Sequence, residues 1–126
     1  YALWKSDGTT SGTVMVKDTY TGTSTLTDYA AVELTAVGDT LFFRSYDSTN
    51  LYALWKSDGT TSGTVMVKDT YNGTSTSTLH APYSLTAVGD TLFFRGTDYT
   101  NGYGLWRCMT QYANLEITAI NEITYS

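Results

Sequence analysis

The chain has 126 residues, of which 41% are apolar, and its formal net charge at pH 7 is −5. This length and this apolar content suffice for one folded domain with a buried core, so we expect a folded chain and not one that is disordered by composition. The seven Lys and Arg residues are spread along the chain, and no apolar run approaches the roughly 20 residues that span a bilayer. We therefore expect no nucleic-acid partner and no membrane insertion.

The composition indicates strands rather than helices. Threonine is the commonest residue and there are 11 tyrosines, and both residue types favour the pleated, half-buried surface of a β-sheet. The single cysteine, Cys108, excludes an internal disulfide and is expected to be a small buried apolar residue. We therefore predict an all-β protein.

The first predicted element is a β-hairpin in residues 1–18. It belongs to a stretch, YALWKSDGTTSGTVMVKDTY, that occupies residues 1–20 and recurs without a change at residues 52–71. A second stretch, LTAVGDTLFFR, occupies residues 34–44 and recurs at residues 85–95. Both stretches thus recur with a period of 51 residues. A fixed period of roughly 20–50 residues indicates an array of stacked supersecondary units.

The next elements form one complete unit. Glycines and clusters of Asp, Thr and Ser divide it into strands, with turns at residues 38–39 and 58–63. The runs TLFFR and YALW are nearly continuous in apolar character, so both faces of this sheet are expected to be covered. Tandem 51-residue units of four antiparallel strands that pack face to face are typical of β-propeller blades. The predicted strands are 32–37, 40–46, 52–57 and 64–69.

The third repeat diverges from the first two. We assign residues 1–51 and 52–102 to two repeats and residues 103–126 to a truncated third, all within a single domain. After YGLWR the expected SDGT is replaced by CMTQ, and residues 115–126, LEITAINEITYS, alternate with a period of two. This tail either folds back as a hairpin at residues 121–122 or forms one strand that outruns its own unit.

A known family carries a similar pattern. The succession LWKSDGT, GTVMVKD and LTAVGDTLFFR resembles the ELWxxDGT repeat of large secreted or surface proteins of bacteria. The leading Glu of that motif is replaced here by Ala2 and Ala53, and by Gly104 in the third copy. The resemblance covers the chain as far as Arg107, and it implies a propeller-like β repeat in an extracellular setting without a known catalytic activity.

The two ends of the chain lead to a hypothesis of self-assembly. The hairpin at residues 1–18 lacks the two strands that precede it in a complete unit, and an isolated hairpin is marginally stable in water. A propeller closed within one chain needs about four or more units. We expect the tail of one subunit to complete the first unit of the next by strand addition, which yields a head-to-tail filament. The residues assigned to this contact are Leu115, Ile117, Ala119, Ile120, Ile123 and Tyr125.

A recurrent set of aromatic residues is assigned to the core between units. The three tryptophans keep the same register in mid-strand among Leu and Ala, which favours packing between units over a role as sugar-stacking platforms. The residues of this set are Trp4, Trp55, Trp106, Phe42, Phe43, Phe93 and Phe94.

Few residues are suited to catalysis or metal binding. A nucleophile–base pair would have to use His80, the only histidine, which lies in a polar loop, and no G-x-S-x-G motif is present. We expect no enzyme activity and no cofactor. Turn aspartates are weak calcium-ligand candidates, although no EF-hand spacing is present and turn capping is the commoner role. These aspartates are Asp7, Asp39, Asp58 and Asp90.

One loop offers candidate glycosylation sites. The stretch TYNGTSTST contains an N-glycosylation sequon at Asn72 and Thr74, and its counterpart in the first repeat carries Thr21 and Thr23 as candidates for O-linked sugars. The alternative is a polar turn without modification.

We predict a structural subunit of an extracellular or cell-surface filament, in bacteria, whose partner is a second copy of itself and whose loops are candidates for glycans. The alternative function is an adhesive or carbohydrate-binding propeller segment of a larger secreted surface protein. A filament subunit uses its ends for contacts, whereas a segment continues into further repeats.

Overall fold

The computed structural model describes residues 2–23, 29–71, 77–98, 100, 102–110 and 116–120. In these residues the protein is all-β, as predicted, with three antiparallel sheets of which none is closed. The described residues include a short 3-10 helix, η2 (Thr78–His80). Among these residues we find no helix that could span a lipid bilayer.

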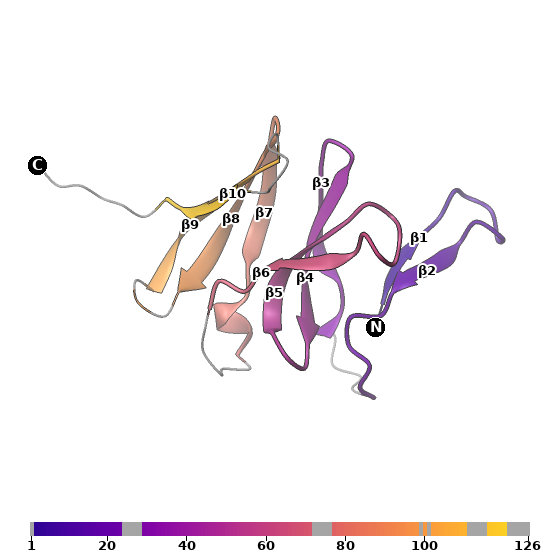
Figure 1. Ribbon diagram of the computed structural model, residues 1–126, viewed down its shortest axis with the longest axis horizontal. Coiled ribbons are helices and arrows are strands. Elements are labelled where there is room, and N and C mark those ends of the chain that lie inside the picture. The colour runs from indigo at the N-terminus through magenta and orange to yellow at the C-terminus, as the bar shows by residue number, and fades with distance from the viewer. Residues whose placement is uncertain are drawn as a thin grey trace, which may run out of the picture.

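The three sheets follow one another along the long axis of the molecule (Figure 1). A two-stranded hairpin comes first, a middle sheet has the order β3-β4-β5-β6, and a last sheet has the order β7-β8-β9-β10. The strands are β1 (Leu3–Lys5), β2 (Val14–Lys17), β3 (Val32–Val37), β4 (Thr40–Asp47), β5 (Leu51–Ser57), β6 (Val65–Lys68), β7 (Tyr83–Val88), β8 (Thr91–Asp98), β9 (Gly102–Met109) and β10 (Glu116–Ala119).

The sequence explains the strands of the middle sheet. The four strands predicted between residues 32 and 69 are present, and their ends agree with the prediction to within one residue. Gly38 (φ 57°) and its copy Gly89 (φ 56°) lie in the left-handed region, which glycine adopts without the steric cost of a β-carbon. Each glycine thereby allows the tight turn that joins the first two strands of its sheet.

The middle sheet packs on the hairpin with one face. Leu3 and Val16 of the hairpin form a buried cluster with Phe43, Ala53 and Trp55 of the middle sheet. Consecutive residues of a strand point to opposite faces, so the residues next to Phe43 and Trp55 point the other way.

The opposite face of the middle sheet packs on the last sheet. Phe42 and Leu54 of the middle sheet belong to a second buried cluster, together with Leu92, Phe94 and Trp106 of the last sheet. Both faces of the middle sheet are therefore covered, as its nearly continuous apolar runs indicate. The two clusters contain equivalent residues, so the chain forms the same sheet-to-sheet contact twice.

The first part of the tail pairs within its own sheet. β10 pairs with β9 and occupies the place in the last sheet that β6 occupies in the middle sheet. Ile117 and Ala119, which were assigned to self-assembly, pack against the core of their own chain. The assignment is corrected for these two residues, because β10 already pairs with the edge of β9 in the last sheet of the same chain.

Candidate assembly site

The β1–β2 hairpin has the geometry of the second half of a unit. Its register pairs Trp4 with Met15, as the register of β5 and β6 pairs Trp55 with Met66. In the described part of the chain, β1 has a strand on one side only, because its sheet consists of β1 and β2 alone. The counterparts of β3 and β4 are missing from this sheet, and they would lie beyond the other edge of β1.

Polar contacts hold the hairpin on the middle sheet. The Lys5 Nζ atom donates a hydrogen bond to the Gly59 carbonyl oxygen at 2.8 Å, and the Lys17 Nζ atom donates to that of Thr64 at 2.9 Å. The Thr61 hydroxyl donates to the Val16 carbonyl oxygen at 2.8 Å. These contacts, with the buried Leu3 and Val16, fix the hairpin although its own sheet is incomplete.

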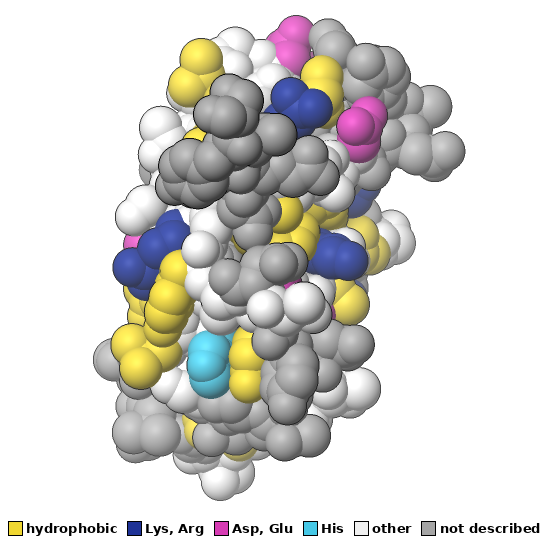
Figure 2. Space-filling model, turned by 90° about the vertical axis from the view of Figure 1, so that its left-hand side faces the viewer, with side chains coloured by type: hydrophobic (Ala, Val, Ile, Leu, Met, Phe, Trp, Pro, Cys, Tyr) yellow, Lys and Arg dark blue, Asp and Glu magenta, His cyan; other side chains and the backbone are white. Residues whose placement is uncertain are grey.

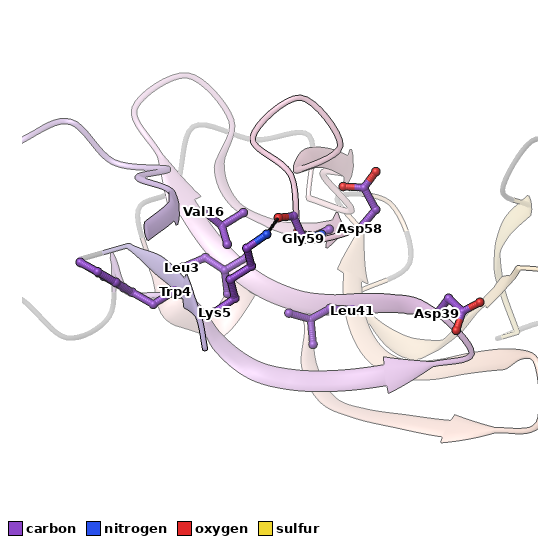
Figure 3. A pocket seen from close by; sticks show the side chains of 9 residues that line it. Leu3, Trp4, Lys5, Val16, Asp39, Leu41, Asp58 and Gly59 are labelled. Carbon is purple, nitrogen blue, oxygen red and sulfur yellow. Dashed lines mark hydrogen bonds between the residues drawn. The ribbon is translucent and has the colours of Figure 1, made fainter. Parts of the chain in front are cut away.

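An open cavity of about 150 Å³ lies between the hairpin and the middle sheet (Figure 3). Its apolar wall consists of Leu3, Val16 and Leu41, whereas Trp4 points away from these residues. Lys5, Ser57 and two aspartates contribute polar groups to the lining. The lining residues are Leu3, Trp4, Lys5, Val16, Asp39, Leu41, Ser57, Asp58 and Gly59.

The corresponding space is filled where the middle sheet meets the last one. There Val37 and Phe42, from the first two strands of the middle sheet, pack with Leu92, which is fully buried. Leu41 is the copy of Leu92 in the middle sheet and is only partly buried. The cavity beside Leu41 therefore marks the position that counterparts of Val37 and Phe42 would occupy.

A second pair of equivalent leucines, Leu85 and Leu34, indicates the same missing strands. Leu85 is 9% exposed because β3 lies beside β7, where the Thr35 hydroxyl donates to the Leu85 carbonyl oxygen at 3.2 Å. The Leu85 backbone amide donates to the Glu33 carboxylate at 3.1 Å. Leu34, the copy of Leu85, is 57% exposed. Leu34, Leu41 and the outer edge of β1 together form what we call the acceptor site.

Two of the predicted core aromatics lie outside the core. Trp55 and Trp106 are buried, as are Phe42, Phe43 and Phe94. Trp4 is 59% exposed, because the described chain has no sheet on its side of the hairpin. Phe93 is half-buried on the outer face of the last sheet, for the same reason. Within the described chain Trp4 therefore lies outside the core between units, and Phe93 is only partly buried.

The turn aspartates bind their own backbone. The Asp7 carboxylate accepts hydrogen bonds from the Thr9 amide and hydroxyl at 2.9 and 2.7 Å, and Asp58 accepts the same pair from Thr60. The Thr9 and Thr60 hydroxyls, more than any other contact, lower the pKa of these carboxyl groups. Asp39 and Asp90 are exposed in turns. Within the described ranges, no three His, Cys, Asp or Glu residues cluster as metal ligands would.

The remaining predicted residues have varied positions. Thr21 and Thr23 are exposed and accessible to modification, and Ile120 is 42% exposed at the end of β10. Cys108 is buried, and burial raises the pKa of its thiol to about 11. The other candidates for self-assembly and glycosylation lie outside the described residues, namely Asn72, Thr74, Leu115, Ile123 and Tyr125.

Comparison of the chain with protein-family models, with curated proteins and with solved structures found no match.

The acceptor site contains residues that the sequence reasoning missed. Leu34 and Leu41 were not among the predicted self-assembly residues, which all came from the tail. The repeat does contain a signal for them. Leu85 and Leu92 follow a complete unit in the sequence, whereas their copies Leu34 and Leu41 follow only the hairpin. The difference between equivalent positions of the two repeats therefore identifies both leucines.

Proposed function

We propose that the protein is a structural subunit of an extracellular, bacterial filament that assembles head to tail by β-strand complementation. In this proposal, residues 121–126 of one subunit, which follow β10, add to the outer edge of β1 in the next. The observation that supports it is the apolar cavity beside Leu41, at a position that Phe42 fills in the complete contact. The resemblance of the repeat to bacterial surface proteins supports the extracellular setting.

The size of the cavity fits the side chains that the tail offers. Apolar cavities of about 150 Å³ accommodate a benzene-sized group, and the volume here is about 150 Å³. Ile123 and Tyr125 lie on one face of the alternating tail sequence. A strand paired with β1 would place one of them over Leu41, and main-chain hydrogen bonds along β1 would add affinity.

We further infer that the units correspond to propeller blades. The equivalent first strands β3 and β7 lie side by side, joined through the Thr35 and Glu33 contacts to Leu85. In a propeller, the equivalent strands of successive blades meet in this way around an axis. The blade whose second half is the hairpin would be completed by the neighbouring subunit.

A deletion tests strand complementation. Removing residues 121–126 leaves β10 and the partly buried Ile117 and Ala119 in place, so the fold is expected to persist while strand addition is lost. Electron microscopy and sedimentation of both chains give the readout. Assembly of the shortened chain at the level of the full chain would overturn the proposed mechanism.

A matched pair of full-length variants removes the ambiguity of a shorter chain. Ile123→Asp with Tyr125→Asp places two charges on the face proposed to enter the cavity and is expected to abolish assembly. Thr124→Asp with Ser126→Asp places the same charges on the opposite face and is expected to reduce it far less. Equal effects of the two variants would show that the tail does not insert one face into the cavity.

The alternative function, adhesion or carbohydrate binding, is favoured by one observation. Trp4 is 59% exposed, and exposed tryptophans can stack on sugars. This function predicts that Trp4→Ala abolishes retention of the protein on immobilised polysaccharides without changing its state of assembly. The filament proposal predicts no such retention.

A further inference from the structure

The tryptophan of the repeat is exposed only at the first end of the stack. Trp4 is 59% exposed, whereas its copies Trp55 and Trp106 are 6% and 8% exposed. Leu3 of the hairpin packs in the cluster of Trp55, and Leu54 of the middle sheet packs in that of Trp106. Each buried tryptophan is thus covered by the sheet that precedes it, and Trp4 has no such cover among the described residues.

The leucine that directly precedes this tryptophan is exposed only at the opposite end. Leu3 is 5% and Leu54 is 0% exposed, because each packs on the sheet that follows it. Leu105, their copy in β9, is 48% exposed on the outer face of the last sheet. The two ends of the stack therefore expose the two complementary halves of a contact that the chain already forms twice.

Neighbouring residues on each outer face repeat this pattern. Met15 is exposed beside Trp4. On the last sheet Val88 and Tyr103 are exposed, although their copies in the middle sheet are buried. Ile120 is exposed next to Leu105, whose carbonyl oxygen accepts its backbone hydrogen bond. Figure 2 views the molecule from the side of the last sheet and shows hydrophobic side chains together with Lys and Arg side chains there.

We define the head face as Trp4 and Met15 of the hairpin, and the tail face as Val88, Tyr103, Leu105 and Ile120 of the last sheet. We propose that the tail face of one copy binds the head face of a second copy, which repeats between molecules the contact between the sheets of one molecule. The inference rests on the proposed function and deepens it, because it assigns the surfaces that meet, independently of strand addition at β1.

A second copy is the occupant that the residues specify. The head face presents Trp4, and Leu54 already packs with Trp106, a copy of this tryptophan. The tail face presents Leu105, which is a copy of Leu54. The two faces lie at opposite ends of the long axis, so they do not meet within one molecule (Figure 1). A contact between unlike faces is heterologous, and its repetition extends a filament by the same step each time.

Complementary variants test this contact. Trp4→Arg blocks only the head face and Leu105→Arg blocks only the tail face, so each variant alone is expected to associate at least about 10-fold more weakly than the parent. An equimolar mixture retains one intact contact, between the tail face of the first and the head face of the second. At concentrations where neither variant associates alone, the mixture is therefore expected to form dimers of twice 13.8 kDa in sedimentation and no longer species.

Val14→Arg is the matched control. Val14 is 40% exposed and its copy Val65 is 38% exposed, so this position stays open even inside the stack. The control is expected to assemble like the parent. Trp4→Arg and Leu105→Arg variants that assemble as strongly as the control, or a mixture without dimers, would overturn the inference.

The fluorescence of the unmodified chain gives a readout that does not depend on variants. Trp55 and Trp106 are already buried, so a blue shift of the emission on assembly reports burial of Trp4. An assembled parent with unshifted emission overturns the face contact and leaves strand complementation standing. A parent that remains monomeric at every concentration overturns the proposed function as well.

Discussion

Identical residues in the two copies form identical turns. The hydroxyls of Ser6 and Thr13 lie 2.7 Å apart, and those of Ser57 and Thr64 lie at the same distance, although the first pair is exposed and the second is buried. Asp7 and Asp58 likewise make the same two bonds to a threonine two residues later. These turns therefore follow from the local sequence and need no support from a neighbouring sheet.

A substitution in one copy tests the cause of the lowered pKa. Thr60→Val removes the hydroxyl that contributes most to lowering the pKa of Asp58, so this pKa is expected to rise toward the ordinary value of 3.8. Part of the lowering remains, because the Thr60 amide still donates to the carboxylate. NMR titration of the side-chain carboxyl carbons measures both aspartates in one sample.

Asp7 is the internal control of this experiment, because its partner Thr9 is unchanged. A lowered pKa in the folded state stabilises the protein above the unfolded pKa, and this contribution is lost as the pH falls through the folded value. The variant is therefore expected to lose less stability than the parent on acidification below about pH 4. A shift of the Asp7 pKa equal to that of Asp58 would mean that the hydroxyl is not the cause.

At the scale of elements, the repeat itself made the strands of the middle sheet predictable. Its turns contain glycines with positive φ, and its apolar runs are bounded by polar clusters, so the limits of each strand are local features. The pairing of neighbouring strands also follows, because short connections join antiparallel neighbours.

The position of an element relative to other sheets was not predictable in this way. Trp4 and Trp55 lie in identical stretches of twenty residues, so no local signal separates the exposed one from the buried one. The alternation in the tail indicates a strand but does not name its partner. β10 takes the place of β6 with a different sequence, because the edge of β9 binds a strand through its backbone.

Two copies of one leucine offer a test of the incomplete unit. Leu92→Ala is expected to lower the free energy of unfolding by about 2–5 kcal/mol, because a fully buried leucine leaves a cavity. Leu41→Ala removes the same atoms beside a space that is already open, so the loss is expected to be less than half of this. Chemical denaturation of both variants without residues 121–126 compares them in the absence of strand addition.

In the full chain under assembling conditions, this difference between the two leucines is expected to shrink. A neighbouring tail in the cavity would bury Leu41 and raise the cost of its removal. Equal costs for Leu41 and Leu92 already in the shortened chain would mean that the acceptor site is closed without a neighbour.

At the scale of the whole molecule, the two ends of the stack of described sheets expose different surfaces. One end exposes Trp4 and the outer edge of β1, and the other exposes Leu105. The proposed strand addition and the proposed face contact join the same pair of ends. They are compatible, because the first uses the edge of the hairpin and its inner side while the second uses its outer side.

The heat capacity of association is the last test, and it concerns both contacts. Burial of apolar surface lowers the heat capacity, so association through Trp4, Leu105 and the cavity at Leu41 is expected to have a negative heat-capacity change. Dilution calorimetry of the parent between 5 and 35 °C, in roughly 10 °C steps, measures it, and the filaments are expected to weaken on cooling. The Leu105→Arg variant provides the control, because it retains strand addition but loses the tail face and should give a smaller change. A change of zero or above in the parent would mean that the subunits associate through polar surface, which would contradict both contacts proposed for these ends.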